Sequence, residues 1–382
     1  MVIYFVFLTI SAATYALFSL GLNLQWGVTG LINFGHVAFM AIGAYSTVLL
    51  SMQGVPIPIA ALIGAGLSAL LGLIIGLSTL RLREDYLGIV TIGVSELVRL
   101  VAKNEAWLTK GTFGVQGYPI PFTCREAYSL NMLSITCPTN SQPEYAVKIL
   151  LIVWLTVICG LALWRLWLWM RFSFREATPT ELSRVVLGLI CGIFVLTVYV
   201  CGALSLYTYD PRAGLMLLTL TTLMVVYIGL EKLVHSPWGR VLKAIREDEE
   251  VPRALGKNVF WYKLQAFMLG GAIAGISGAF YAWQFSVFPD NFEPLVTFNA
   301  WIIITIGGAG NNLGTVIGAA IFWGYYELTR TDFFKGIFNA LHLDDTQQGA
   351  FRIMIIGLIL MLLMVLRPQG ILGKKEELTL GR

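Results

Sequence analysis

Residues 56–80 read PIPIAALIGAGLSALLGLIIGLSTL, a run without a single Asp, Glu, Lys or Arg. About 20 consecutive apolar residues are enough for an α-helix to cross the hydrocarbon core of a bilayer. Similar runs recur along the chain, in which 57% of the 382 residues are hydrophobic and 13% are charged. A soluble domain has roughly 25% charged residues. The composition therefore excludes an ordinary soluble enzyme and predicts an integral membrane protein.

The apolar runs predict an all-α fold, a polytopic transmembrane helical bundle of about eight to ten spans. We expect spans at 3–24, 36–52, 56–80, 86–107, 147–170, 185–206, 213–231, 261–284 and 349–366, and a broken or re-entrant segment near 298–329. The whole chain, residues 1–382, is expected to form a single transmembrane domain.

The distribution of Lys and Arg predicts which side of the membrane each loop faces, because basic loops are retained in the cytoplasm. The loop 232–263 carries seven of these residues and is therefore placed in the cytoplasm. Alternation of the spans then puts the N-terminus and the loop 108–146 outside and the C-terminus in the cytoplasm. The net charge of +4 does not indicate nucleic-acid binding, because the basic residues lie in short turns.

Cys124 and Cys137 share the polar loop that this topology places outside, where disulfides persist. A disulfide between them is a hypothesis, and two free thiols are the alternative. The other cysteines, Cys159, Cys191 and Cys201, lie in apolar segments and are expected to be small buried hydrophobes.

Small residues recur at every fourth position in three segments. They are Gly64, Ser68, Gly72 and Gly76, then Gly271, Gly275 and Ala279, then Gly310, Gly314 and Gly318. Because lipid tails give apolar side chains no reason to associate, such stripes hold membrane helices together through close backbone approach. The stripes predict a tightly packed helical bundle.

Two segments, 22–46 and 298–329, combine several glycines with polar residues in apolar surroundings. Irregular backbone at membrane depth is tolerated where protein buries it or where it lines a wet cavity. Interrupted helices in both halves of a chain point to a translocation pathway. The candidates for lining this pathway are Asn33, His36, Gly308 and Asn311.

Glu96 and Arg99 lie three residues apart in the span 86–107 and therefore share one helical face. Ionisable groups inside a membrane usually pair with one another or face a cavity. The two residues form either a neutralised structural pair or part of the pathway lining. His36 is likewise either a hydrogen-bonded packing histidine or a substrate ligand.

The sequence indicates no metal site and no catalytic centre. The histidines at positions 36, 235 and 342 lie far apart without companion ligands at metal-site spacing. The patterns HExxH, GxSxG and Walker A do not occur. We therefore expect no enzyme activity and no cofactor bound by this chain. If the protein moves a substrate against its concentration gradient, another chain must supply the energy.

The charged segment 236–258, SPWGRVLKAIREDEEVPRALGKN, lies in the longest cytoplasmic loop. It favours a helix from Arg240 to Glu250, and Pro252 and Gly256 limit its length. The chemistry leaves two interpretations open, a solvated amphipathic connector or a helix that docks a soluble partner.

This segment resembles the coupling region of LivM-type permease subunits of ABC importers for branched-chain and other hydrophobic amino acids, whose pattern is close to GRxLxAIREDExxAxxLG. The matching residues are Gly239, Arg240, Leu242, Ala244, Ile245, Arg246, Glu247, Asp248, Glu249, Ala254, Leu255 and Gly256. Further stretches that resemble the family are INFGHVAFMAIGAY (32–45), DYLGIVTIG (85–93), GGAGNNLG (307–314) and LRPQGILG (366–373). The resemblance covers most of the chain.

The resemblance implies a multi-pass permease of the bacterial inner membrane that forms the translocation path with a homologous LivH-type permease. It also implies two ABC ATPase subunits that bind ATP-Mg and a soluble substrate-binding protein. The residues that would couple to an ATPase are Gly239, Arg240, Ala244, Ile245, Arg246, Glu247, Asp248, Glu249, Leu255 and Gly256. The expected substrate is a branched-chain or other neutral amino acid, with urea or a short-chain amide as the alternative.

The chain departs from the family in a few places. The loop 124–146 and the basic stretch 165–184 look longer than the family requires, and Pro252 stands where relatives often have a helix former. A passive channel fits the sequence less well than an importer, because a channel needs no large charged loop. An intramembrane enzyme fits less well because His36 has no obvious Ser or Asp partner nearby.

Overall fold

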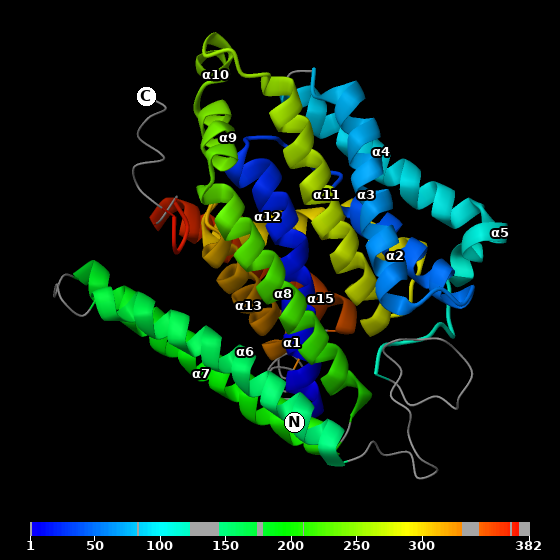
Figure 1. Cartoon of the computed structure of the whole chain (residues 1–382), viewed down its shortest axis with the longest axis vertical. Helices are drawn as coiled ribbons and strands as arrows, with labels where there is room; N and C mark the ends of the chain where they lie inside the picture. Colours follow the sequence, from blue (N-terminus) through cyan, green and yellow to red (C-terminus); the bar gives the residue numbers. More distant parts are fainter. Residues whose placement is uncertain are drawn as a thin grey trace. The chain divides into compact units, whose positions relative to one another are not determined.

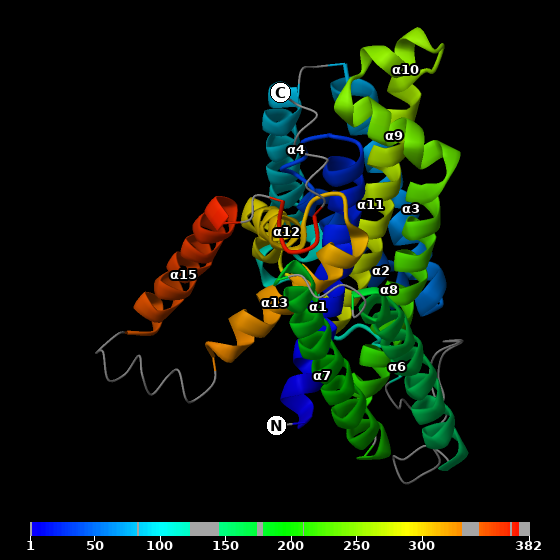
Figure 2. The ribbon, with the colours of Figure 1, turned by 90° about the vertical axis from the view of Figure 1, so that its left-hand side faces the viewer.

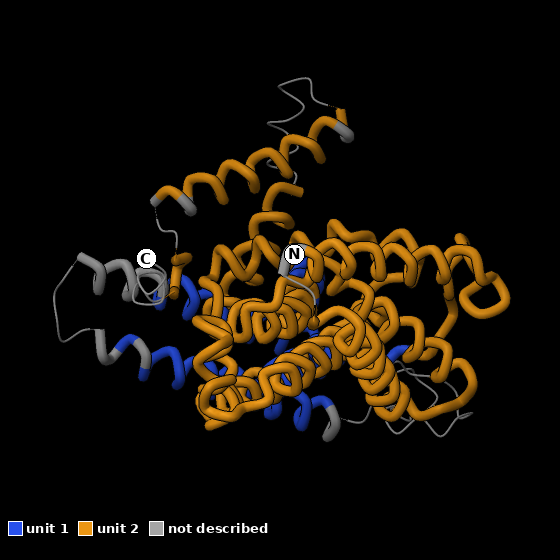
Figure 3. Tube along the Cα trace, turned by 90° about the horizontal axis from the view of Figure 1, so that it is seen from above, with its two compact units in different colours: residues 1–10, 120–224 blue, residues 11–119, 225–382 orange. Residues whose placement is uncertain are grey.

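The computed structural model describes residues 2–81, 84–122, 145–173, 179–208, 210–330, 344–366 and 369–373. The chain divides into two compact units (Figure 3), residues 1–10 with 120–224 and residues 11–119 with 225–382. The described secondary structure is helical, apart from an isolated antiparallel bridge between Val115 and Val287. The predicted all-α class is confirmed.

The helices follow the predicted spans closely. They are α1 (Val2–Leu22), the π-helix η1 (Asn23–Val28), α2 (Val37–Met52), α3 (Ile57–Thr79), α4 (Glu84–Asn104), α5 (Ala106–Thr109), the 3₁₀-helix η2 (Gly111–Phe113), α6 (Tyr145–Ser173), α7 (Pro179–Thr208), α8 (Pro211–His235), α9 (Pro237–Glu247), α10 (Glu250–Ala254), α11 (Val259–Gln284), the 3₁₀-helix η3 (Pro289–Phe292), α12 (Pro294–Gly307), α13 (Asn312–Leu328) and α15 (Asp345–Leu366). α3, for example, matches the uncharged run 56–80 to within one residue at each end.

Six helical segments in the described part of the chain are long and apolar enough to cross a membrane. They are Val2–Val28, Ile57–Thr79, Lys148–Leu168, Gly188–Thr208, Arg212–His235 and Val259–Gln284. α12 and α13 pass the same test as a pair that is bent by 116° at its break. α2 and the apolar part of α15 are shorter apolar helices. The polytopic bundle and its broken segment agree with the sequence prediction, whereas α4, in the expected span 86–107, is not among the helices that pass this test.

The larger unit is held together by close approach of α2, α3 and α11, which lie side by side in Figure 1. A Cβ added at Gly43 of α2 would lie 2.5 Å from the Cα of Gly275 on α11. On α3, the backbone at Gly72 faces Met268 of α11, and the Ser68 hydroxyl donates to the Phe39 carbonyl at 2.8 Å. The first two small-residue stripes therefore pack helices together, as predicted.

The third stripe joins the two halves of the broken segment. Gly314 and Gly318 of α13 lie against the backbone carbonyls of Gly307 and Ile303 on α12. A Cβ at either glycine would meet these carbonyl oxygens, so α12 and α13 approach as closely as backbone allows. The stripe thus fixes the geometry of the bend.

The smaller unit contains α6 and α7, which pack against each other. Both helices expose many apolar side chains, including Leu150, Val153, Ile190 and Ile193, each more than half exposed. Because α6 and α7 are each long enough to cross a bilayer, we expect their exposed apolar faces to contact lipid or another membrane helix.

The segment after η2 is fastened to the end of α11. The amide of Val115 donates to the Val287 carbonyl at 3.0 Å, and the Tyr118 hydroxyl donates to the carbonyls of Phe285, at 2.8 Å, and Ala282. Burial raises the pKa of Tyr118 to about 12, so its hydroxyl stays protonated and remains a donor. These bonds fix the start of the loop 108–146 at one end of the larger unit.

Candidate functional site

The first helix break follows α1, which continues into η1 and then leaves helical geometry before α2 begins. The helix is closed by the amides of Gly30 and Leu31, which donate to the carbonyls of Trp26, at 2.9 Å, and Gln25, at 2.8 Å. Gly30 has a φ of +82°, a left-handed conformation that glycine adopts without strain. The predicted interruption in 22–46 is therefore a real change of backbone path.

Buried amide side chains anchor this first break. Asn33 accepts from the Gly35 amide at 2.9 Å and donates to Gln25 Oε1 at 2.8 Å. Gln25 in turn donates to the Phe267 carbonyl of α11 at 2.9 Å. The indole of Trp301 donates to the Asn33 carbonyl at 3.3 Å and packs on Trp26, with ring centroids 4.2 Å apart. The break is thus tied to α11 and α12 at once.

The second break lies between α12 and α13 and depends on Gly308 and Gly310, whose φ angles are +108° and +81°. Asn311 begins α13 as its N-cap, because its Oδ1 accepts from the Gly314 amide at 3.1 Å. The side-chain nitrogen of Asn311, Nδ2, donates to the Leu372 carbonyl at 2.8 Å. Gly308 and Asn311, both predicted at the pathway, therefore build the turn itself.

A short C-terminal strap, residues 369–373, closes the second break (Figure 2). The amides of Ile371 and Leu372 donate to the carbonyls of Ile306, at 2.9 Å, and Gly307, at 3.0 Å. These are among the last carbonyls of α12, which have no partner within the helix. The strap therefore replaces the missing helical turn.

The two breaks meet at a junction formed by Asn23, Glu231, Gly310 and Asn312. Asn23 accepts from the Gly310 amide at 2.9 Å and donates to Asn312 Oδ1 at 3.1 Å. Asn312 donates to the Glu231 carboxylate of α8 at 3.1 Å. Gly27 also lies against the backbone of Gly310. A side chain of η1 thus accepts a hydrogen bond from a backbone amide that lies almost 300 residues later in the chain.

The charged loop forms two short helices beside this junction. α9 begins at Pro237 after the N-cap Ser236, and its Leu242 and Ile245 are buried. The helix ends at Glu247, three residues before the predicted end, because Asp248 adopts extended backbone and its side chain accepts from the Glu250 amide at 2.9 Å. α10 follows and includes Pro252, and Gly256 ends it with a φ of +74°. The loop is helical but kinked.

Arg246 connects α9 to the first break. Its guanidinium donates to the Gly27 carbonyl at 2.5 Å. The α-carbon of Gly30 faces the Arg246 backbone and Cγ, and Gly310 lies against the guanidinium. Of the predicted coupling residues, Arg246 is therefore the one whose described bonds reach the helix breaks.

The other predicted coupling residues are distributed over both sides of the loop. Arg240, Glu247, Asp248, Leu255 and Gly256 are exposed, whereas Gly239 and Ile245 are buried and Ala244 is half-buried. Glu249 pairs with Lys263 at 2.6 Å and with Arg253 at 3.3 Å. Arg240, Glu247 and Asp248 offer charged side chains to a partner, and docking by the exposed residues stays a prediction.

His36 is completely buried just before α2. Its Nε2 lies 3.2 Å from the Phe18 carbonyl, and its ring packs between Phe18 and Phe39, with centroids 4.8 and 5.6 Å away. Its Nδ1 has no hydrogen-bond partner among the described residues. The geometry suits a packing histidine, and a role in the pathway stays a prediction.

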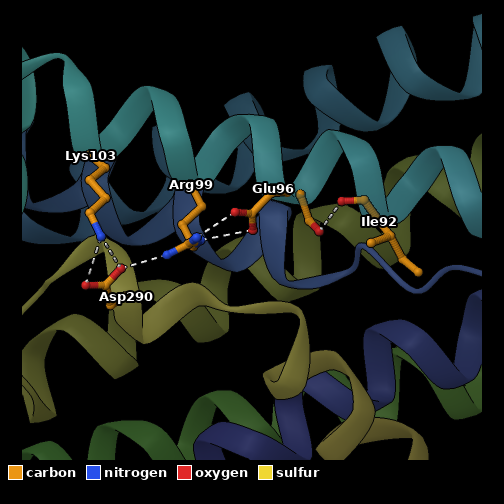
Figure 4. A network of polar contacts seen from close by, with 6 residues as sticks. Ile92, Glu96, Arg99, Lys103 and Asp290 are labelled. Atoms are coloured by element: carbon orange, nitrogen blue, oxygen red, sulfur yellow. Dashed lines mark hydrogen bonds and ion pairs between the residues drawn. The ribbon is translucent and has the colours of Figure 1, made fainter.

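Glu96 and Arg99 belong to an ion-pair network between α4 and η3 (Figure 4). Arg99 donates to both Glu96 oxygens, at 2.5 and 3.0 Å, and to Asp290 at 2.7 Å. Lys103 is a second basic partner of Asp290, at 3.1 Å. The predicted pair exists and is shared with η3, which sequence spacing did not indicate.

Replacing Asp290 with Asn is expected to weaken the tie between α4 and η3 only slightly. The Asp290 side chain is 57% exposed, and exposed ion pairs contribute about 0.2–1 kcal/mol, less at high salt. Thermal unfolding of the purified protein at low and high salt measures the loss. If this variant instead kept its thermal stability and lost uptake, the network would belong to the pathway.

Two further predictions lie outside the described residues, the disulfide between Cys124 and Cys137 and the length of the loop 124–146, of which only the last two residues are described, in α6. In the described part of the chain, Cys159, Cys191 and Cys201 are free. Cys159 is buried as expected, whereas Cys191 and Cys201 are half-buried. The same part contains no group of three or more His, Cys, Asp or Glu residues placed to hold a metal ion.

Asn23, Gln25 and Glu231 belong to the site but are not predicted as site residues from the sequence. The sequence offers one indication of them: each is a polar residue in an apolar stretch next to a glycine-rich segment. Asn23 and Gln25 are completely buried, where a polar side chain is costly unless it is bonded. Which partner each one finds depends on contacts that are distant in sequence.

Two interrupted helices that meet inside a bundle of membrane-length helices are typical of membrane transport proteins. The chain belongs to the family of branched-chain amino acid transport system permease components, whose model matches residues 4–365. The resemblance to LivM-type subunits is confirmed. With its apolar helices, this membership makes the chain a multi-span protein of the inner membrane and a transport subunit.

The chain is similar to several curated permeases. The high-affinity branched-chain amino acid transport system permease proteins LivM of Salmonella typhimurium and Escherichia coli are each 29% identical over 367 residues, which cover 94% of this chain and 67% of the relative. A probable LivM protein of Methanocaldococcus jannaschii is 22% identical over 96% of this chain and 92% of the relative. No solved structure matches the chain.

Proposed function

We propose that this chain is the transmembrane permease subunit of an ATP-driven ABC importer for branched-chain and other neutral amino acids. It forms the translocation path with a homologous LivH-type permease. Two ABC ATPase subunits bind ATP-Mg and supply the energy, and a soluble binding protein delivers the substrate. The LivM relatives named for high-affinity branched-chain amino acid transport support this substrate class.

The observation that carries the proposal is the position of α9. Its inner side is buried through Leu242 and Ile245 and bonded through Arg246 to the first helix break. Its outer side exposes the charged residues Arg240 and Glu247. A helix that is fixed to interrupted helices and presents charge outward suits contact with a soluble subunit that moves, because the contact then acts on the breaks directly.

The proposed assembly also fixes an orientation. ATPase subunits work in the cytoplasm, so the loop 232–263 lies there, the N-terminus lies outside and the C-terminus lies in the cytoplasm. The bacterial inner membrane is the compartment in which a binding protein can reach the outer face. Asn33, His36, Glu96, Arg99, Gly308 and Asn311 remain the candidates for residues along the path.

Uptake of labelled leucine, alanine and urea tests the proposal. Cells that express the complete system with this chain are expected to accumulate leucine and alanine from dilute solution, and cells without the chain are not. Proteoliposomes with and without internal ATP provide the control for energy supply, because a permease without its own ATP site depends on the ATPase subunits.

Each alternative outcome has a distinct meaning. Loss of urea uptake alone on removing the chain would replace amino acids by urea or a short-chain amide as the substrate. Uptake that continues in proteoliposomes without ATP and never exceeds the external concentration would make the protein a passive channel and would overturn the importer proposal.

A further inference from the structure

Arg246 occupies an unusual position for a basic residue in an exposed loop. It lies four residues after Leu242 and seven after Gly239, so it shares the helical face that α9 buries. Its side chain therefore points towards the bundle and not towards the cytoplasm. The other basic residue of the predicted coupling set, Arg240, is exposed.

The surroundings of Arg246 consist of backbone from both breaks. The guanidinium donates to the Gly27 carbonyl, Gly30 faces its Cα and Cγ, and Gly310 lies beside Nη1. Each of these neighbours is a glycine, so no side chain separates the guanidinium from the main chain. A single arginine is thereby bonded to the first break, and its Nη1 would lie 3.1 Å from a Cβ built on Gly310 of the second break.

The Gly27 carbonyl is a suitable acceptor for this contact. The amides that follow it, of Gly30 and Leu31, donate to the carbonyls of Trp26 and Gln25. The carbonyl end of a helix carries partial negative charge, which favours a cation. A hydrogen bond from a charged donor is about twice as strong as a neutral one. The bond therefore holds α9 to the end of η1.

We propose that Arg246 is the positioning residue that links the coupling helix α9 to both helix breaks, so that movement of α9 changes the geometry of η1 and of residues 308–311. This role rests on the proposed importer function and adds to it the path by which the loop acts. Arg246 therefore acts within the permease, and contact with the ATPase belongs to the exposed residues of the loop.

The test compares Arg246→Met with Arg246→Lys in the complete complex. Met keeps an unbranched stem like that of arginine and removes the guanidinium with its charge and its donors, whereas Lys keeps one charged donor group. Three quantities are measured: the amount of ATPase subunit that copurifies with the permease, ATP hydrolysis, and leucine uptake. Arg246→Met is expected to retain the ATPase subunits and to hydrolyse ATP while uptake falls about tenfold or more. Arg246→Lys is expected to recover part of the uptake.

Hydrogen exchange of the assembled complex gives a second, independent measurement. In Arg246→Met, peptides that cover residues 23–31 are expected to exchange about tenfold faster, because the bond that holds the end of η1 is lost. Lys257→Met is the matched control. It removes the same charge from an exposed side chain of the same loop and should leave the exchange of these peptides unchanged.

Three results would overturn the linking role. If Arg246→Met lost the ATPase subunits, Arg246 would be a docking residue. Leucine uptake at the wild-type rate in that variant, or unchanged hydrogen exchange of residues 23–31, would show that the bond does not link α9 to the breaks. If Arg246→Met does not fold and therefore does not assemble, the uptake and the hydrogen-exchange rates of Arg246→Lys test the linking role instead. Failure of the importer proposal is separate, since it appears in the wild-type complex as uptake that does not depend on ATP.

Discussion

Gly27→Ala is expected to reduce uptake by about tenfold or more while the protein remains folded in the membrane. A Cβ at this position would lie 3.0 Å from the Cα of Gly310 and closer still to the Gly310 nitrogen and to Oδ1 of Asn23. The two breaks must separate to admit it, and the bond from the Gly310 amide to Asn23 is lost. Overpacking of this kind costs about 1–3 kcal/mol, which falls on the junction and not on the core of α2, α3 and α11.

Leucine uptake, together with the elution profile and thermal unfolding of the purified protein, measures the effect. Gly324→Ala is the matched control, because Gly324 also lies in a helix next to the breaks but has open space around its α-carbon. Wild-type uptake by Gly27→Ala would show that the contact between the breaks does not matter for transport. Loss of uptake in Gly324→Ala would show that any methyl group in these helices is harmful.

Gly43→Ala is expected to destabilise the whole protein by about 3 kcal/mol. The new Cβ would lie 2.5 and 2.6 Å from the Cα and carbonyl carbon of Gly275, and these backbone atoms cannot turn aside as a side chain can. α2 and α11 would have to move apart along the contact on which the larger unit depends. The small gain in helix propensity from alanine, about 1 kcal/mol, does not offset this.

Gly66→Ala on α3 is expected to have the opposite effect on stability. Gly66 is exposed and has nothing within 4 Å of the added Cβ, so alanine should stabilise the helix by about 0.5–1 kcal/mol. Thermal unfolding in the same detergent compares the two variants. Gly43→Ala should lower the melting temperature by about 4 °C. An unchanged or higher melting temperature for Gly43→Ala would mean that the helices are less tightly packed than the structure shows.

The sequence predicts the helices well because each one is encoded locally. A run such as 56–80 needs only apolar length to become α3, and the spacing of Gly64, Ser68 and Gly72 already indicates a packed face. Those stripes lie against α2 and α11 as expected. The glycines of 22–46 and 307–314 likewise indicate breaks, because a left-handed residue such as Gly30 or Gly310 is a local property of the backbone.

The partners of the polar residues could not be predicted, since they depend on contacts between distant parts of the chain. Asn23 meets Gly310 and Asn312 only after the bundle has formed. The end of α9 was missed for a local reason, because the side chain of Asp248 bonds the Glu250 amide and competes with the helix. Arg246 was predicted as a coupling residue, but its inward direction required the helical face to be known.

The C-terminal strap gives the biosynthesis of this protein a fixed order. Because Ile371 and Leu372 supply the donors for the last carbonyls of α12, the ribosome must translate through codon 372 before the second break can be completed. Helices made earlier can already be inserted and packed by then. A messenger truncated within the codons for residues 367–371 would therefore yield a chain whose helices can be inserted in the membrane but whose second break lacks both of these donors.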